Sequence, residues 1–404
     1  MFMSKLVALA FSGGLDTSWC VPWLKEHGSE RIVTVTVDVG GMTDEDRRSL
    51  EERSQELRAD RHIYVDARRA FFDEIVQYLI FGNVLRGQAY PLCVGAERSL
   101  QAREVARVAR ELKADAIAHG CTAAGNDQVR FEVALRVVAP DVALLAPVRD
   151  EAPRREDEVR FLLDRGYSVP AKATSYSINA GLWGVTIGGK ETLDTRESLP
   201  EDAWVRTRGA FDRPMSPEVH TISFVRGIPS ALDGQSAEPV TVIEAIDALA
   251  SRFGIGRGIH LGETILGMKG RVAFEAPAAS TIITAHRELE KLVLTGRQTL
   301  VKDTVSRTYG DLIHEGQFLE PTCRDIEALL RSTQERVTGD VRCLFRQGSL
   351  FVEGVTSPYS LKDASKALYG EAAGEWTPED ARGFSRLVGL PSMLHARAKE
   401  GGRS

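Results

Sequence analysis

The chain has 404 residues, of which 43% are hydrophobic and 27% are charged, and its formal net charge is −6. This length predicts two or three domains with an ample core, and the composition is typical of an ordinary globular protein. The negative charge argues against a general nucleic-acid surface, although it leaves a local basic patch open, and no apolar run is long enough to predict a membrane span.

The first motif follows a short apolar run. Residues 6–10 predict a buried strand and residues 17–27 predict a helix, with the sequence Phe-Ser-Gly-Gly-Leu-Asp between them. Two adjacent glycines allow a sharp turn that presents backbone N–H groups, and the hydroxyls of Ser12, Thr17 and Ser18 add donors beside the helix N-terminus. The loop therefore predicts a cradle for an anion such as pyrophosphate. It contains neither a Walker A sequence nor Gly-x-Gly-x-x-Gly, and an ordinary strand–helix turn is the alternative.

Strands and helices then alternate. The patterns predict strands over residues 31–37, 62–65, 116–119 and 142–145, and helices over residues 43–59, 68–81, 98–112 and 129–138. Residues 43–59 are charged with few apolar positions, which predicts a solvated surface helix. The alternation indicates an open parallel sheet with helices on both faces, and ligands bind such sheets beyond the carboxyl ends of the strands. Residues 12–18 and 120–127 both fall there.

The second loop, residues 120–127, is built from small residues and three polar side chains. Gly120 and Gly125 permit a close backbone approach, and Thr122, Asn126 and Asp127 supply the polar groups. A carboxylate beside an amide suits the head group of an amino acid, with Asp127 facing the ammonium. Alone, the same loop is equally consistent with a turn followed by a helix cap.

The remainder of the chain predicts a different architecture. A charged helix over residues 154–165 leads to a boundary at residues 166–170, beyond which the pattern is α+β. The expected strands cover residues 219–224, 240–243, 271–274, 281–284, 340–345 and 349–352, and the expected helices cover residues 243–253, 288–294 and 324–337. From about residue 362 the chain is polar and Ala-rich, as in a helical arm that packs on a partner or a frayed terminus.

Five scattered cysteines without a Cys-x-x-Cys pair predict reduced thiols and a cytoplasmic protein. The first residues lack the apolar segment of a signal peptide, which agrees with that location. The eight histidines show no metal-ligand spacing, so no protein-bound metal is expected.

Nine motifs carry a resemblance to a known family, and they run in that family's order along nearly the whole chain. They include AFSGGLDTS (10–18), AIAHGCTAAGNDQVRFE (116–132), SYSINAGLWG (175–184), LGMKGR (266–271) and TQERVTGDVR (333–342). The chain resembles argininosuccinate synthase, an ATP pyrophosphatase-type ligase. The resemblance implies an α/β fold: an open parallel sheet of the ATP pyrophosphatase (adenine nucleotide alpha hydrolase-like) type in residues 1–169, an α+β synthetase domain in residues 170–361 and a C-terminal helical arm in residues 362–404.

It also implies a two-step reaction of arginine biosynthesis in a homotetramer that binds small molecules and neither nucleic acid nor membrane. ATP adenylates the ureido oxygen of citrulline, and the amine of aspartate then displaces AMP.

The resemblance implies three groups of site residues, with Asp16 and Asp127 as the catalytic carboxylates. ATP, which would bring Mg²⁺, is assigned to Ala10, Phe11, Ser12, Gly13, Gly14, Leu15, Asp16, Thr17, Ser18, Val37 and Gly120. Aspartate is assigned to Thr122, Asn126 and Asp127. Citrulline, or another acceptor, is assigned to Tyr90, Gly95, Asn126, Arg130, Ser177, Thr186, Glu263 and Phe274.

Departures from the family pattern gather on the acceptor side. Residues 92–95 lack two hydroxyls, the carboxylate position is Gly262 with Glu263 shifted by one, and Phe274 replaces a tyrosine. Each lost contact that leaves a substrate group unpaired costs ~1–3 kcal/mol. Either waters or Glu263 compensate, or the chain is a paralogue that joins aspartate to a different ureido, amide or carboxyl acceptor in specialised metabolism. Cys93 lies in the same stretch and is either reactive or a small buried residue.

Two other classes are less well supported. A nucleotide sensor without turnover would be expected to lose the glycine pair or Asp127, and both are intact. An RNA-modifying relative would want a basic surface or paired cysteines, and Cys20 and Cys121 are not paired for sulfur transfer.

Overall fold

The computed structural model describes residues 5–123, 125–169, 176–365 and 376–401. The chain divides into two compact units, residues 1–357 and residues 358–404. The finer division at residues 169 and 361 stays a prediction.

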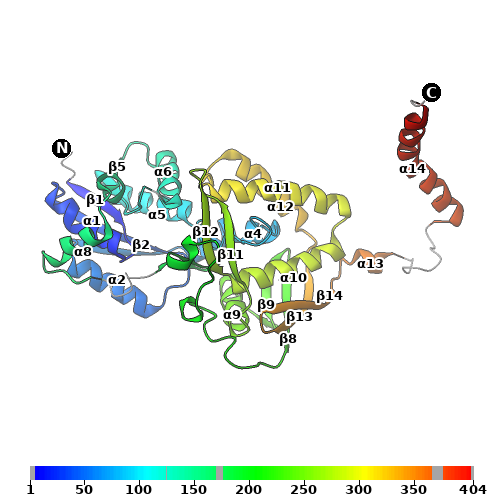
Figure 1. Cartoon of the computed structure of the whole chain (residues 1–404), viewed down its shortest axis with the longest axis horizontal. Coiled ribbons are helices and arrows are strands. Elements are labelled where there is room, and N and C mark those ends of the chain that lie inside the picture. The colour runs from blue at the N-terminus through cyan, green and yellow to red at the C-terminus, as the bar shows by residue number, and fades with distance from the viewer. Residues whose placement is uncertain (1–4, 124, 170–175, 366–375, 402–404) are drawn as a thin grey trace. The chain divides into compact units, whose positions relative to one another are not determined.

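The first unit begins with the expected parallel sheet (Figure 1). Its strands are β1 (Leu6–Ala10), β2 (Arg31–Asp38), β3 (Arg61–Asp66), β4 (Ala116–Ala118) and β5 (Ala143–Leu145), in the order β3-β2-β1-β4-β5 with every pair parallel. The strand order reverses between β1 and β4. The loops that follow these two strands therefore meet at the switch point where such sheets bind ligands.

Helices cover both faces of this sheet because alternate residues of β1 point to opposite sides. Val7 and Leu9 pack with residues of α1 (Leu15–Glu26) and α8 (Arg155–Leu163), whereas Ala8 packs with residues of α5 (Arg98–Glu111). The remaining helices of this part are α2 (Asp44–Glu56), α6 (Asn126–Val138) and α7 (Pro147–Glu151). The predicted helix over residues 68–81 is confirmed, as α3 (Arg68–Phe71), a π-helical turn (Phe72–Val76) and α4 (Gln77–Phe81) in direct succession.

The rest of the unit contains two antiparallel sheets. One has the order β11-β12-β7-β6 and consists of β6 (Ser177–Gly181), β7 (Gly184–Gly188), β11 (Arg257–Glu263) and β12 (Lys269–Glu275). The other has the order β10-β9-β8-β13-β14 and consists of β8 (Glu218–Val225), β9 (Ile228–Leu232), β10 (Gln235–Ser236), β13 (Gly339–Arg346) and β14 (Ser349–Thr356). The helices here are α9 (Pro239–Arg252), α10 (Pro277–Val293), α11 (Gly296–His314) and α12 (Pro321–Thr333).

Two predicted strands are wrong. Residues 240–243 and 281–284 are rich in β-branched residues, but they lie in α9 and α10. Pro239 and Pro277 occupy the first turns of these helices, where proline is favoured, and burial of one helical face outweighs the local strand preference.

The β6–β7 turn joins the second sheet to the carboxyl end of the first. The Leu182 amide donates to the Val39 carbonyl at 3.0 Å. Gly40 has φ +100°, and a Cβ there would lie 2.8 Å from the Leu182 nitrogen. Only glycine permits this approach, which sets β6 and β7 beside the two ligand loops.

The second unit contains α13 (Leu361–Ala364) and α14 (Pro378–Gly401). Phe384, Leu387, Val388 and Leu394 are exposed on α14 at helical spacing. Among the described residues, no helix combines the length and apolar character that a membrane crossing requires.

A buried polar network holds the helices of the first unit together. Glu290 on α10 accepts from Asn83 Nδ2 at 2.5 Å and from Gln334 Nε2 at 2.8 Å, and it pairs with Lys302 Nζ at 3.0 Å. His286 bridges the two amides, 2.8 Å from Asn83 Oδ1 and 2.9 Å from Gln334 Oε1. These partners come from α10, α11 and the residues after α4 and α12, so one carboxylate organises four segments.

Candidate active site

The loop after β1 has the strained turn that its sequence predicts. Gly13 has φ +69°, and a Cβ there would lie 2.6 Å from Leu50 Cδ2 of α2. Gly14 has extended dihedrals and precedes the first turn of α1. The first N–H groups of a helix have no intrahelical acceptor, so this turn presents donors to an anion.

Hydroxyl groups close the loop. Thr17 Oγ1 lies 3.2 Å from Ser12 Oγ and accepts from the Ser12 amide at 3.4 Å. Ser18 Oγ donates to the Gly13 carbonyl at 3.4 Å. Ser12 is exposed, Thr17 is half-buried and Ser18 is buried, so the Ser12 hydroxyl is the most open of the three.

Arg53 of α2 contacts the first loop, which the sequence did not reveal. Its Nε donates to Ser18 Oγ at 3.0 Å and its NH1 donates to Glu56 at 2.7 Å. The prediction of a solvated helix is confirmed for most of α2, but Leu50 and Arg53 face the loop. Their spacing of three residues on an otherwise charged helix was the available signal.

Asp16 points toward α8 rather than into the loop. Its carboxyl is hydrogen-bonded to Glu158, a buried residue of α8. Burial raises the pKa of Asp16, and burial followed by the charge of Asp16 raises the pKa of Glu158 to about 8. The pair therefore holds one proton between them at neutral pH and connects α1 to α8.

The loop after β4 lies directly against the first loop. A Cβ at Gly120 would be 3.0 Å from Thr17 Cγ2 and 3.2 Å from the Thr17 nitrogen. The contact is to backbone as well as to side chain, so Thr17 cannot simply rotate away. Both loops were predicted at one edge of the sheet, and the structure brings them into contact.

We expect Gly120→Val to raise KM for ATP by about 10- to 100-fold, since its side chain would separate the loops and misplace the N–H cradle. Steady-state kinetics with ATP varied measures the change. Gly354→Val is the matched control, because nothing lies within 4 Å of a Cβ built at Gly354. Equal KM values for the two variants would contradict the proposed role of this contact.

Asp127 lies between two guanidinium groups. Arg98 Nε donates to its Oδ2 at 2.9 Å and Arg130 NH1 donates to its Oδ1 at 2.8 Å. Although burial raises the pKa of Asp127, the charges of Arg98 and Arg130 lower it to about 2. The neighbouring Asn126 accepts from the Ile265 amide at 2.9 Å, which ties this loop to the β11–β12 turn. Asp127 is thus a fixed anion with one third of its side chain exposed.

Arg130 is buried, and its hydrogen bonds hold its guanidinium group in one orientation. Its Nε donates to the His314 carbonyl at 2.8 Å, and its NH2 lies 3.2 Å from His314 Nδ1. Gly95 has φ +103°, and a Cβ there would lie 2.7 Å from Arg130 Cζ. Burial and then the charge of Arg130 lower the pKa of His314 to about 3, so this imidazole is neutral.

Arg98 was also missed by sequence analysis. Its NH2 donates to Asn179 Oδ1 at 2.9 Å, so one guanidinium joins Asp127 to strand β6. Asn179 is paired with Thr186 on β7, and Thr186 with Phe274 on β12. Arg98 therefore connects the second loop to the sheet that carries the predicted acceptor residues.

Aromatic side chains line the acceptor side. Tyr90 is buried, and its ring lies 5.1 Å from that of Phe274 and stacks on His260 at 5.4 Å. The Tyr90 hydroxyl donates to the Val94 carbonyl at 2.9 Å. Cys93 is buried, and burial raises the pKa of its thiol to about 12, which favours the small buried residue over a reactive thiol.

Not every predicted residue joins this cluster. The Glu263 carboxylate pairs with Lys269 across the β11–β12 turn at 2.7 Å and is largely exposed. Ser177 is exposed near the start of β6, two residues from Asn179. Val37 lies near the end of β2, and its carbonyl accepts a hydrogen bond from Gln101 Nε2 of α5 at 3.4 Å.

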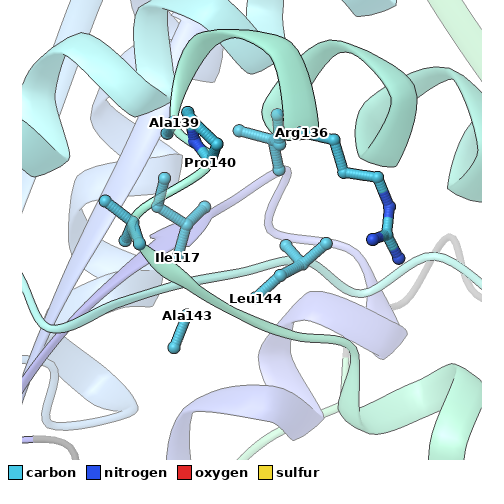
Figure 2. A pocket seen from close by; sticks show the side chains of 8 residues that line it. Ile117, Arg136, Ala139, Pro140, Ala143 and Leu144 are labelled. Carbon is cyan, nitrogen blue, oxygen red and sulfur yellow. The ribbon is translucent and has the colours of Figure 1, made fainter.

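A pocket of about 300 Å³ lies elsewhere, between the end of α6 and strand β5 (Figure 2). It is lined by Ile117, Leu135, Arg136, Ala139, Pro140, Val142, Ala143 and Leu144. None of the predicted site residues lines it.

An open parallel sheet with a glycine loop at its switch point defines a nucleotide-binding domain of the HUP class, which is ATP pyrophosphatase-like. The family profile for the arginosuccinate synthase N-terminal HUP domain matches residues 6–168, and the profile for the arginosuccinate synthase C-terminal domain matches residues 176–395. The chain belongs to the argininosuccinate synthase family, as the resemblance predicted.

Full-length relatives agree with this assignment. The argininosuccinate synthase of Xanthomonas campestris is 40% identical over 98% of this chain and 99% of its own length. That of Methanocaldococcus jannaschii is 35% identical over 98% of this chain and 100% of its own length. That of Pyrobaculum aerophilum is 38% identical over 99% of this chain and 100% of its own length.

Proposed function

We propose that this protein is an ATP-dependent carbon–nitrogen ligase that joins citrulline to aspartate and releases AMP and pyrophosphate, as a step of arginine biosynthesis. The observation that carries the proposal is the contact between the two loops. Gly120 lies against Thr17, so the anion cradle adjoins the loop that holds Asn126 and Asp127. A nucleotide and an amino acid bound to these loops would be neighbours.

The first loop would bind the phosphates of ATP. The N–H groups of residues 12–18 would hold the departing pyrophosphate, a charge that a preorganised cradle stabilises without reorganisation. Asp16 and Asp127 both have protein partners, so Mg²⁺ would be bound mainly by phosphate oxygens, with the outer Ser12 hydroxyl as the loop's own oxygen. When bound, Mg²⁺ shares the charge of the phosphates.

The second loop would bind aspartate, with the ionised Asp127 accepting from its ammonium and Thr122 and Asn126 beside it. A carboxylate oxygen accepts more than one hydrogen bond, so the two arginines leave room for this contact. Arg130 would bind the carboxylate of citrulline. A urea carbon is a poor electrophile until its oxygen is adenylated, after which alignment with the aspartate amine supplies most of the remaining acceleration.

Isotope transfer tests this function. With citrulline labelled with ¹⁸O in its ureido group, we expect the label in AMP, together with stoichiometric pyrophosphate and argininosuccinate. Omission of aspartate should abolish argininosuccinate formation. Release of ADP, or AMP without the label, would contradict the proposal.

The different acceptor that the departures suggested gains no support from the comparisons, because the relatives above are all named argininosuccinate synthase and match 98–99% of the chain. A homotetramer is proposed on the exposed apolar residues of α14, such as Phe384 and Leu387. A cytoplasmic location is proposed on the five free cysteines.

A further inference from the structure

We propose that His260 is a specificity-determining residue for the acceptor, where its Nε2 accepts a hydrogen bond from an N–H group of citrulline. This inference rests on the proposed function and extends it, because it names a group that replaces the carboxylate missing at Gly262. His260 is not among the residues that the sequence predicted for the site.

The His260 side chain lies over Gly262. The two residues are two apart on β11 and so face the same side of the strand. A Cβ built at Gly262 would lie 2.5 Å from His260 Nε2 and 3.2 Å from its Cε1. Any side chain at position 262 would displace this ring, so the imidazole takes the space that glycine leaves.

The ring is fixed against the acceptor cluster. It stacks on Tyr90 with an interplanar angle of 18°, and Tyr90 in turn contacts Phe274. A Cβ at Gly87 would also lie 3.0 Å from His260 Cε1. The Tyr90 ring and the close approach of Gly87 leave the imidazole little freedom to turn.

His260 Nε2 is a buried polar atom that needs a partner. Within the described residues, neither His260 Nε2 nor His314 Nε2 has a hydrogen bond, although both atoms are buried. Burial and then the charge of Arg86 lower the pKa of His260, which keeps the imidazole neutral and able to accept. An unpaired buried polar atom is costly, and a substrate N–H group would remove that cost.

These features fit an amino acid with a ureido side chain. Citrulline carries N–H donors at both ends, and Arg130 would hold its carboxylate. The neutral acceptor at His260 would then select an N–H group over a carboxylate or a thioether. The substrate class is therefore a ureido amino acid, bound between Arg130 and the Tyr90–His260 stack.

Substitution of His260 provides the test. We expect His260→Ala to raise KM for citrulline by about 10- to 100-fold, with KM for ATP and for aspartate unchanged, because one buried contact to this substrate is lost. His220→Ala is the matched control, since His220 lies on β8 and bridges Glu218 and Asp233. It should leave all three KM values unchanged.

A second variant distinguishes loss of a substrate contact from a folding defect. Removal of the imidazole opens the space over Gly262, so Gly262→Glu combined with His260→Ala should restore citrulline affinity that His260→Ala loses. An unchanged KM for citrulline in His260→Ala, an equal rise in all three KM values, or no recovery in the double variant would overturn the inference. If the unmodified protein makes no argininosuccinate, the proposed function fails instead.

Discussion

Arg98→Ala is expected to lower kcat/KM for aspartate by about 100- to 1,000-fold, since displacement of a substrate-binding loop by as little as 1 Å costs about 100-fold. Arg98 holds Asp127 at 2.9 Å and Asn179 at 2.9 Å. Without it, Asp127 keeps only Arg130 among its partners in the described residues, and strand β6 loses the hydrogen bond by which Arg98 connects it to the second loop.

The pH dependence of this variant has a predictable sign. Arg98 lowers the pKa of Asp127. A carboxyl group with a lowered pKa in the folded protein stabilises the fold above its ordinary pKa, and this stabilisation is lost as the pH falls toward about 2. In Arg98→Ala the pKa of Asp127 should rise from about 2 toward its ordinary value, so Asp127 contributes less stability at neutral pH and less of it is lost as the pH falls. Acid unfolding followed by circular dichroism would detect this shallower loss.

Arg107→Ala is the control for both measurements. Arg107 lies on the same helix with about half of its side chain exposed, and its ion pairs among the described residues are with the nearby Glu104 and Glu111. It should change activity less than about twofold, because exposed ion pairs contribute little. If the two arginine variants behaved alike, Arg98 would have no special part in positioning Asp127.

Glu290→Gln is expected to lower the free energy of unfolding by about 3–5 kcal/mol, the cost of leaving a buried charge without its partner. The charge left behind is that of Lys302, which is fully buried, lies 3.0 Å from Glu290 and would keep only the longer, 3.6 Å pair with the exposed Asp303 among the described residues. Urea denaturation monitored by fluorescence measures the change.

Two further variants separate the ion pair from general disruption. Glu288→Gln alters the same helix at a half-exposed site paired with Lys291 and should be nearly neutral. Addition of Lys302→Met to Glu290→Gln should recover part of the stability, since it removes the uncompensated charge. A double variant less stable than the single one would show that the lost hydrogen bonds dominate instead.

The first half of the fold could be predicted because its strands are local and regular. Residues 6–10 and 31–37 are short apolar or β-branched runs between turn residues, and each is a strand of the parallel sheet. The strand predicted for residues 281–284 is wrong because four β-branched or apolar residues are compatible with either a strand or a helix. Only the helical period of the surrounding residues distinguishes the two. Helix α11 was not predicted at all, since its mixed composition carries no clear periodicity.

The site residues likewise divide into those that the local sequence predicts and those that it does not. The glycine loop and the second loop are contiguous in sequence, so their residues could be named in advance. Arg98 and His260 act through contacts with segments distant in sequence, such as Asn179 and Tyr90. No spacing rule reports such contacts, because the tertiary fold alone creates them. Glu263 shows the converse, since its motif position suggested a substrate contact but its carboxylate pairs with Lys269.

The β6–β7 turn explains why substitutions could accumulate on one side of the site. The Leu182 amide and the Val39 carbonyl form the joint between the sheets, with Gly40 beside them. Because main-chain atoms form this joint, it does not depend on which side chains the neighbouring strands carry. A side chain such as Phe274 can therefore be replaced while these main-chain contacts stay in place.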